Sequence, residues 1–135
     1  MSNLPIFDVA GSAMSAQSVR LSTVASNLAN ADSVAGSPDA VYRAKQPVFS
    51  AEPVAGDPSL AGVQVTQVTE STAAPLKRYE PGHPLADAQG YVYAPDVDPV
   101  AQMVDMISAS RSYQANVEVF NTARDLAVAT LGMGK

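Results

Sequence analysis

Residues 99–131, P-V-A-Q-M-V-D-M-I-S-A-S-R-S-Y-Q-A-N-V-E-V-F-N-T-A-R-D-L-A-V-A-T-L, decide the fold of this chain. Asp98 precedes them as a helix N-cap, and Pro99 suits the first helical position because no backbone N–H is needed there. No proline or glycine interrupts the stretch after Pro99. Gly132 and Gly134 supply a stop, since glycine tolerates the left-handed conformation at helix ends. The stretch therefore predicts one long helix.

One face of this helix carries a mostly apolar stripe whose positions alternate steps of three and four residues. The positions are Met103, Met106, Ser110, Tyr113, Val117, Phe120, Arg124, Ala127 and Leu131. This spacing is typical of a coiled-coil seam, and it is equally typical of an amphipathic helix that packs on an ordinary core. The stripe alone leaves both interpretations open.

A second long helix is predicted over residues 4–31, with Pro5 in its first turn. Its apolar seam consists of two sets of positions at intervals of seven: Phe7, Met14, Leu21 and Leu28, each followed three residues later by Ala10, Gln17, Val24 and Ala31. A strict seven-residue repeat favours a left-handed helix pair. Serine and alanine cover most of the remaining surface, so this helix buries little area alone and is marginal in water.

The two terminal helices can pair antiparallel as a coiled-coil-like hairpin. A hairpin of this kind, about 40 Å long, has little core per residue. The sequence leaves two interpretations of that shortfall open. Either partners outside the chain complete the packing, or both helices dock on the middle segment.

The middle of the chain is rich in turns, which are strongest at residues 36–39 and 56–58 and at Pro81-Gly82-His83-Pro84. Apolar and polar residues alternate over Val63–Thr69, which is the best strand, and we expect Leu76–Tyr79 to pair with it. Shorter strand pieces are expected at residues 41–45, 48–49 and 90–93.

The predicted fold class is therefore α+β, with two long terminal helices and a small, loop-rich β unit between them. We expect a helical domain made of residues 1–33 and 99–135, and an outward-facing, β-rich domain made of residues 34–98. The few strands leave sheet edges exposed unless another subunit covers them.

The formal net charge is −5, and all of the excess lies in the middle of the chain. Residues 32–98 carry nine acidic and four basic side chains, whereas charges cancel in residues 1–31 and in residues 99–135. This distribution predicts that the middle faces solvent and that the ends face protein. The sequence has no basic patch of the kind that binds nucleic acid, so no nucleic-acid partner is expected.

No apolar run reaches the roughly 18 residues of a membrane span, so no direct membrane insertion is expected. The N-terminus lacks the basic segment of a secretory signal peptide, and Asp8 stands where such a peptide has its apolar segment. The N-terminus therefore does not resemble a secretory signal peptide. We therefore expect any export from the cytoplasm to leave the N-terminus intact.

Nothing in the sequence supports an enzyme. The chain has no cysteine, and His83, its only histidine, lies between prolines in a turn and is more consistent with a structural role. No nucleophile elbow and no phosphate-binding glycine loop is present. We expect no catalytic residue, no metal, no cofactor and no small-molecule substrate.

Three stretches are too particular for a generic surface. The first is S-N-L-A-N-A-D-S at residues 26–33, where Asn27 and Asn30 indicate side-chain hydrogen bonds because asparagine is a poor residue inside a helix. The second is Y-E-P-G-H-P-L-A-D-A-Q-G-Y-V at residues 79–92, and the third is R-S-Y-Q-A-N-V-E-V-F-N-T-A at residues 111–123.

These stretches, in this order, resemble the rod and hook family of the bacterial flagellar axial structure, and most closely its proximal rod members. The resemblance is strong over both terminal helices and residues 81–106, and weak over residues 34–62. The sequence departs from the family pattern after the asparagine motif. Ser33 and Gly36 replace its usual turn there, and an additional Ser-Pro-Asp turn precedes Tyr42.

The resemblance implies a structural subunit without enzymatic activity, exported unfolded through the flagellar type III apparatus without signal cleavage. It further implies assembly in the periplasm, with copies of itself and other rod proteins, into the basal-body rod that connects motor to hook. Family members place their terminal helices in the inner layer of the tube, against helices of neighbouring subunits.

The expected assembly interface follows from the two seams and the asparagine motifs. Its residues are Phe7, Met14, Leu21, Val24, Asn27, Leu28, Asn30, Met103, Met106, Tyr113, Asn116, Val117, Phe120 and Leu131. Three alternatives remain at this stage: another proximal rod subunit of the same family, a soluble helical export chaperone or adaptor, and a small enzyme with an unrecognised site.

Overall fold

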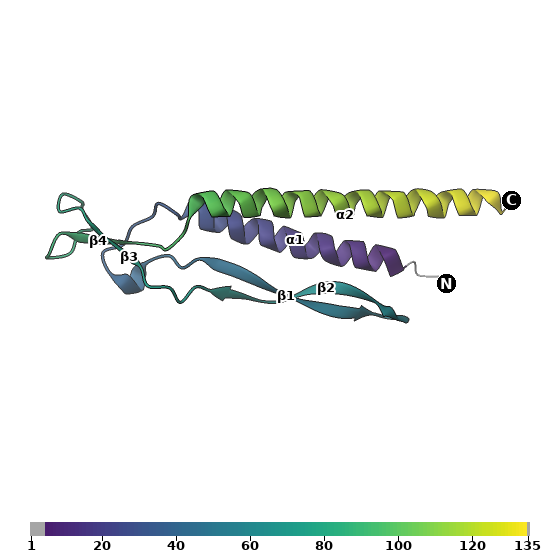
Figure 1. Ribbon diagram of the computed structural model, residues 1–135, viewed down its shortest axis with the longest axis horizontal. Coiled ribbons are helices and arrows are strands. Elements are labelled where there is room, and N and C mark those ends of the chain that lie inside the picture. Colours follow the sequence, from purple (N-terminus) through teal and green to yellow (C-terminus); the bar gives the residue numbers. More distant parts are fainter. Residues whose placement is uncertain (1–4, 135) are drawn as a thin grey trace.

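Two antiparallel helices run along most of the molecule in the computed structural model, which describes residues 5–134 (Figure 1). Helix α1 spans Pro5–Ala29 and helix α2 spans Pro99–Met133. Asp98 caps α2 as predicted, because its carboxylate accepts a hydrogen bond from the Val100 N–H at 2.9 Å. The expected helix start at residue 4 lies outside the described residues. Together with the strands between the helices, this arrangement confirms the predicted α+β fold class.

The end of α2 differs slightly from the expectation. Gly132 lies within the helix, which continues to Met133, and Gly134 is the C-cap. Neither glycine has a positive φ, so the helix ends without the left-handed residue that the sequence suggested.

A long hairpin replaces the short strand pieces and turns that were expected before residue 63. Strand β1 spans Lys45–Val54 and pairs antiparallel with β2, Asp57–Glu70, with a bulge after Val48. Gly56 has a φ of +97° and reverses the chain at the tip. The turn-forming prolines of this region stand within the strands; a two-stranded hairpin tolerates them because each strand has a free edge that needs no N–H donor.

The hairpin packs along α1, on the side away from α2, so that α1 lies between two layers (Figure 1). Gly62 is buried against α1, and a β-carbon there would lie 2.7 Å from the hydroxyl oxygen of Ser12. Glycine therefore permits the close approach of β2 to the helix. The core is built mainly from small side chains: Ala10, Ala16, Val24, Val41, Val92, Ala94 and Ala109.

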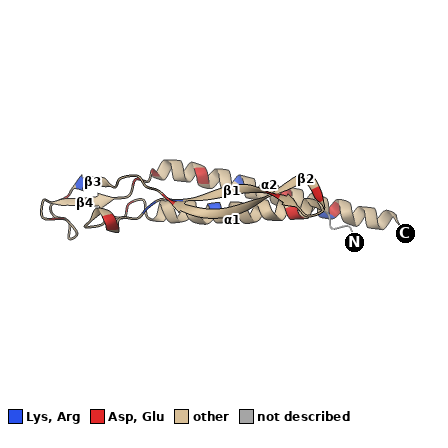
Figure 2. Ribbon diagram, turned by 90° about the horizontal axis from the view of Figure 1, so that it is seen from below, with Lys and Arg blue, Asp and Glu red and all other residues tan. Residues whose placement is uncertain are grey.

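A second, smaller sheet lies at one end of the molecule, beyond the start of α2 (Figures 1 and 2). It pairs β3, Leu76–Tyr79, with β4, Tyr91–Ala94. The expected pairing of Leu76–Tyr79 with Val63–Thr69 is wrong, because Leu76–Tyr79 pairs with β4 in a separate sheet and β2 pairs only with β1 among the described strands. Ala35 adds an isolated bridge to Tyr93 through reciprocal backbone hydrogen bonds of 2.8 and 2.9 Å. A short 3-10 turn, Pro38–Ala40, follows it.

Candidate assembly interface

The two helices meet through aromatic, ionic and amide contacts spread along α1. Near the start of α1, the rings of Phe7 and Phe120 pack edge to face with centroids 4.8 Å apart. Further along, a nitrogen of the Arg20 guanidinium lies 3.2 Å from Oδ1 of Asp105. These pairs fix the register of the two antiparallel helices.

The residues predicted for the assembly interface fall into three groups by exposure within the single chain. Val24 and Asn27 are buried. Those that are half-buried are Phe7, Met14, Leu21, Leu28, Asn30, Met106, Asn116, Val117 and Phe120. Those that are exposed are Met103, Tyr113 and Leu131. Their contact with other subunits stays a prediction.

The buried line of α2 is rotated slightly from the predicted stripe. Ala109 is fully buried, whereas the adjacent stripe residue Ser110 is only half-buried. Met106 and Phe120 belong to both lines. The rotation follows from size, because alanine lets α1 approach closely where larger side chains would separate the helices.

Asn27 is the centre of a buried polar cluster that joins both helices to the β1–β2 hairpin. Its Nδ2 donates to the Lys45 carbonyl at 2.9 Å and to Oε1 of Gln102 at 3.0 Å. Its Oδ1 accepts from the Lys45 N–H at 2.8 Å and from the Tyr42 hydroxyl at 2.9 Å. With only 2% of its surface exposed, Asn27 makes all the hydrogen bonds that its amide allows.

The partners of Asn27 were not recognised in the sequence. The Tyr42 hydroxyl also lies 3.0 Å from the Ser26 hydroxyl. The tyrosine that follows the additional turn therefore contacts two residues of the asparagine motif. Gln102, at the start of α2, carries no sequence signal beyond its polarity. Asn30 is bonded more locally, from Nδ2 to the Ser26 carbonyl at 2.8 Å.

Gln17 is a polar position within the otherwise apolar seam of α1. Its Oε1 is buried and has no hydrogen-bond partner among the described residues. A buried carbonyl without a donor destabilises the folded chain, at a cost of about 1–3 kcal/mol. Gln17 is therefore a weak point in the helical seam of the isolated chain.

Two surfaces of α2 are apolar and uncovered. We call the first the N-terminal patch; it consists of Val100, Met103, Val104 and Ile107, which are 51–68% exposed. We call the second the C-terminal overhang; it consists of Leu126, Val128, Leu131 and Met133, which are 62–84% exposed. Figure 1 shows this end of α2 extending past α1 and the hairpin, and Figure 2 shows that its final turns carry no charge.

The loop between β3 and β4 is organised by Asp87. Its carboxylate accepts from the backbone N–H of Tyr91 and of Gln89, each at 2.9 Å, and from the Tyr93 hydroxyl at 3.1 Å. The Tyr91 N–H contributes most to holding the pKa of Asp87 below its ordinary value, against an opposing effect of desolvation. The same contact with Asp87 raises the pKa of Tyr93.

His83 has a local structural contact in this loop. Its Nδ1 accepts a hydrogen bond from the Leu85 N–H at 3.0 Å. The rings of Tyr79 and Tyr91 pack nearby with centroids 5.2 Å apart, and the Lys77 ammonium lies 4.1 Å from the Tyr91 centroid. The second sequence motif thus builds a loop that is held together by side-chain contacts.

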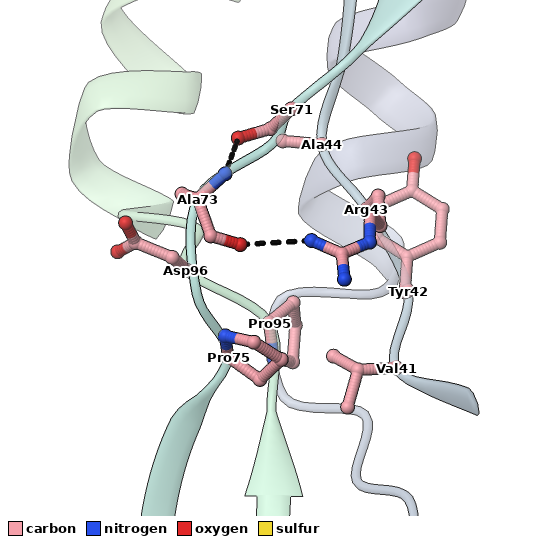
Figure 3. Close-up of a pocket in the computed structure, with 9 residues that line it drawn as sticks. All are labelled: Val41, Tyr42, Arg43, Ala44, Ser71, Ala73, Pro75, Pro95 and Asp96. Carbon is pink, nitrogen blue, oxygen red and sulfur yellow. Dashed lines mark hydrogen bonds between the residues drawn. The ribbon is translucent and has the colours of Figure 1, made fainter. Parts of the chain in front are cut away.

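The small sheet joins the rest of the chain at a narrow junction (Figure 3). The Arg43 guanidinium donates to the Ala73 carbonyl at 2.8 Å, and the Ser71 N–H donates to the Ala44 carbonyl at 2.8 Å. Pro75 and Pro95 line the same place. The hollow between them, about 10 Å³, has room for about one water and none for an organic ligand.

Residues 5–134 were compared with the requirements of a metal site and of a membrane-spanning helix. No three His, Cys, Asp or Glu side chains among them are grouped so as to hold a metal ion. Neither described helix is long and apolar enough to cross a membrane. The most exposed large apolar side chains among the described residues, Leu131 and Met133, lie at the end of α2.

Comparison with known proteins identifies the family. Residues 7–36 match the family described as "Flagella basal body rod protein", and residues 88–133 match "Flagellar basal body rod FlgEFG protein C-terminal". The chain is 55% identical to the flagellar basal-body rod protein FlgC of Salmonella typhimurium and 56% identical to that of Escherichia coli O6:H1, over all of both chains in each case. The chain belongs to the FlgC family of flagellar basal-body rod proteins. It is a structural rod subunit, as the sequence motifs predicted.

A less similar FlgC also matches most of the chain. FlgC of Aquifex aeolicus is 42% identical over 88% of this chain and 87% of its own length. The two family matches cover α1 with the asparagine motif, and β4 with nearly all of α2. The whole β1–β2 hairpin lies between them, and its residues 45–62 belong to the region where the sequence resemblance was weak.

Proposed function

We propose that this FlgC-family chain occupies the proximal part of the rod and assembles there through its terminal helices with copies of itself and with other rod proteins. The assembled tube links the motor to the hook and transmits torque. The observation that carries the proposal is the exposed, uncharged apolar surface of α2, which includes Leu131 at 76% exposure. A surface of this kind is costly in water and is typical of a protein–protein contact.

The proposal includes the route of the chain to its site. The chain is exported unfolded by the flagellar type III apparatus, keeps its N-terminus, and folds fully where the rod grows in the periplasm. A core of small side chains and the unpartnered Gln17 carbonyl support a marginally stable monomer. Contacts in the polymer then supply the missing burial and offset the ordering entropy. No catalytic activity, cofactor or small-molecule substrate is part of this function.

Mass spectrometry of purified flagellar basal bodies tests the proposal. Basal bodies stripped of membrane and filament should contain this chain in fixed proportion to other rod proteins, and its N-terminal peptide should be present. Recovery of the chain only from the soluble cytoplasm would exclude the rod assignment and favour an export chaperone. Recovery in the rod without its N-terminal peptide would exclude export without cleavage.

A further inference from the structure

The two strands of the β1–β2 hairpin exchange sides along α1. At the open end of the hairpin, β1 faces the helix, and the Lys45 N–H and carbonyl both bond to the Asn27 side chain. Towards the tip it is β2 that faces the helix, because the Val63 N–H donates to the Ser12 hydroxyl at 3.1 Å. Figure 1 shows the strands crossing between these points. The hairpin is therefore attached to α1 at two separate places and through opposite edges.

A β-bulge lies between the two attachments. The pairing register of β2 skips Thr66, opposite the step from Val48 to Phe49. A bulge bends its strand and increases the local twist, which accounts for the exchange of sides. The bulge divides the hairpin into a base next to Asn27 and a part that we call the arm, residues 49–65.

The base is held much more firmly than the arm. Asn27, which is only 2% exposed, makes two hydrogen bonds to Lys45. Within the arm, every residue from 51 to 61 except Val54 and Asp57 is exposed. A segment with few buried contacts opens at a lower free-energy cost than the rest of a fold. The arm therefore has the features of a part that opens on its own.

Hollows lie between the arm and α1. One, of about 300 Å³, is lined by Asp8 and Ser12 of α1 and by the arm around Gly62. Another, of about 200 Å³, lies next to the bulge and is lined by residues that include Arg20 of α1 and Phe49 of β1. Contacts across such spaces are few, because dispersion attraction requires atoms that touch. The arm therefore meets α1 closely at Gly62 and not along its whole length.

We propose that the arm is hinged at the bulge and opens away from α1 as a unit, while the base and the two helices stay folded. The pairing of β1 with β2 is retained in the open arm, and the contact between Val63 and Ser12 is lost. Opening uncovers the side of α1 that faces away from α2. The arm therefore controls access to this side of the helix, and the motion belongs to the single chain.

Distances between pairs of spin labels on the purified chain test this motion, because the chain has no cysteine that competes for labelling. One pair joins the arm to α2 through Ser59→Cys and Gln114→Cys. The matched pair joins the base to α2 through Gln46→Cys and Gln114→Cys, and all three positions are exposed. The arm pair should give two distances and the base pair one. A single distance in the arm pair, or an equal spread in both pairs, would overturn the proposal.

Gly62→Ala should shift the arm towards its open position. Its β-carbon would lie 2.7 Å from the Ser12 hydroxyl oxygen in the closed position. The share of the longer distance in the arm pair should therefore rise at least about threefold. Gly11→Ala is the matched control, because nothing lies within 4 Å of its added β-carbon, and it should leave the share unchanged. An unchanged share in Gly62→Ala, or the same rise in both variants, would contradict a hinged arm.

A disulfide that closes the arm provides the reverse test. A β-carbon at Gly62 would lie 3.5 Å from the Ser12 β-carbon, which is within the range of disulfides. Ser12→Cys combined with Gly62→Cys should therefore join the arm to α1 on oxidation. The oxidised and reduced forms of this one variant are then compared by amide hydrogen exchange, so that the sequence is the same in both.

Two neighbouring amides separate opening of the arm from separation of its strands. N–H groups along an antiparallel strand point alternately to either side, so the Val63 N–H faces α1 and the Gln64 N–H faces β1. Oxidation should slow exchange at Val63 at least about tenfold and leave exchange at Gln64 nearly unchanged. Equal slowing at both amides would show that the strands separate, and no slowing at Val63 would show that the arm does not open. Either result would overturn the proposal.

Discussion

The side-chain nitrogen of Asn27 on α1 donates a hydrogen bond to Oε1 of Gln102 on α2 at 3.0 Å. The same amide group exchanges hydrogen bonds with both backbone groups of Lys45 on β1. One buried side chain therefore links all three layers of the molecule. Because the surrounding core consists of small residues, we expect this polar cluster to contribute an unusually large share of the stability of the free chain.

Replacement of Asn27 by alanine should destabilise the purified chain by about 3 kcal/mol, because several buried polar groups lose their partners together. Urea unfolding followed by circular dichroism measures the effect. Asn30→Ala is the control, since Asn30 is half-buried and its side chain makes only a local bond to Ser26. It should cost about 1 kcal/mol or less. Equal losses in the two variants would contradict the linking role of Asn27.

Gly62→Ala should separate β2 from α1, because its β-carbon would meet the Ser12 hydroxyl. We expect a loss of about 1–3 kcal/mol and faster amide exchange at Val63, whose N–H is bonded to that hydroxyl at 3.1 Å. Gly11→Ala is the control, since nothing lies within 4 Å of its added β-carbon. This control should stabilise the helix by up to about 1 kcal/mol.

A double-mutant cycle checks the cause of the Gly62 effect. Ser12→Ala removes the oxygen that the new β-carbon would contact, so the double variant should lose less stability than the sum of the two single variants. Simple additivity would show that the hairpin is displaced for another reason.

The sequence predicted the helices because their signals are local. Asp98 and Pro99 mark the start of α2, and the seven-residue spacing of Phe7 and its equivalents marks the seam of α1. Part of the candidate site was predictable in the same way, since Asn27 was identified as a residue that needs hydrogen-bond partners. The 100/103/104/107 spacing of the N-terminal patch was also visible in the sequence but was not recognised.

The strand pairing was not predictable, because it depends on which segments meet in space. On the sequence pattern alone, Leu76–Tyr79 could pair with Val63–Thr69 or with Tyr91–Ala94, and in the structure it pairs with Tyr91–Ala94. The extent of β1 was hidden for a different reason. Its prolines suggested turns, but a free strand edge accommodates them.

The β3–β4 loop should lose order in acid. The pKa of Asp87 lies below its ordinary value of 3.8 in the folded chain, so the ionised carboxylate stabilises the fold. This contribution is fully present above about pH 4 and is lost as the pH falls through the lower, folded pKa. Titration by NMR should show the backbone resonances of Tyr91 and Gln89 shifting together in that range.

Asp87→Asn isolates the contribution of the charge. It should weaken the loop already at neutral pH and remove most of its dependence on acid, because the asparagine cannot ionise. The hairpin tip provides an internal comparison, since bonds from Ser59 likewise lower the pKa of Asp57 there and remain intact in this variant. An unchanged acid transition at Tyr91 would show that another group controls the loop.

Gln17→Met should stabilise the free chain by about 1 kcal/mol, because it removes the buried carbonyl that has no partner and keeps a similar shape. The neighbouring Ser18→Ala is the control, since Ser18 is exposed and its replacement should change stability by less than about 0.5 kcal/mol. Denaturant midpoints compare the two. A loss of stability in Gln17→Met would indicate that the Gln17 side chain makes a favourable contact in solution.

Leu126→Glu and Phe120→Glu should separate assembly from folding. Leu126 is 64% exposed, so a carboxylate there leaves the stability of the free chain within about 0.5 kcal/mol of wild type. Phe120 packs on Phe7 between the helices, and a carboxylate there should cost about 3 kcal/mol or more while the β3–β4 loop stays folded.

Both variants should be absent from purified basal bodies. Gln114→Glu, which adds the same charge at an exposed polar position of α2, should be incorporated normally. Normal incorporation of Leu126→Glu would show that the overhang is not an assembly surface, whatever the fate of Phe120→Glu.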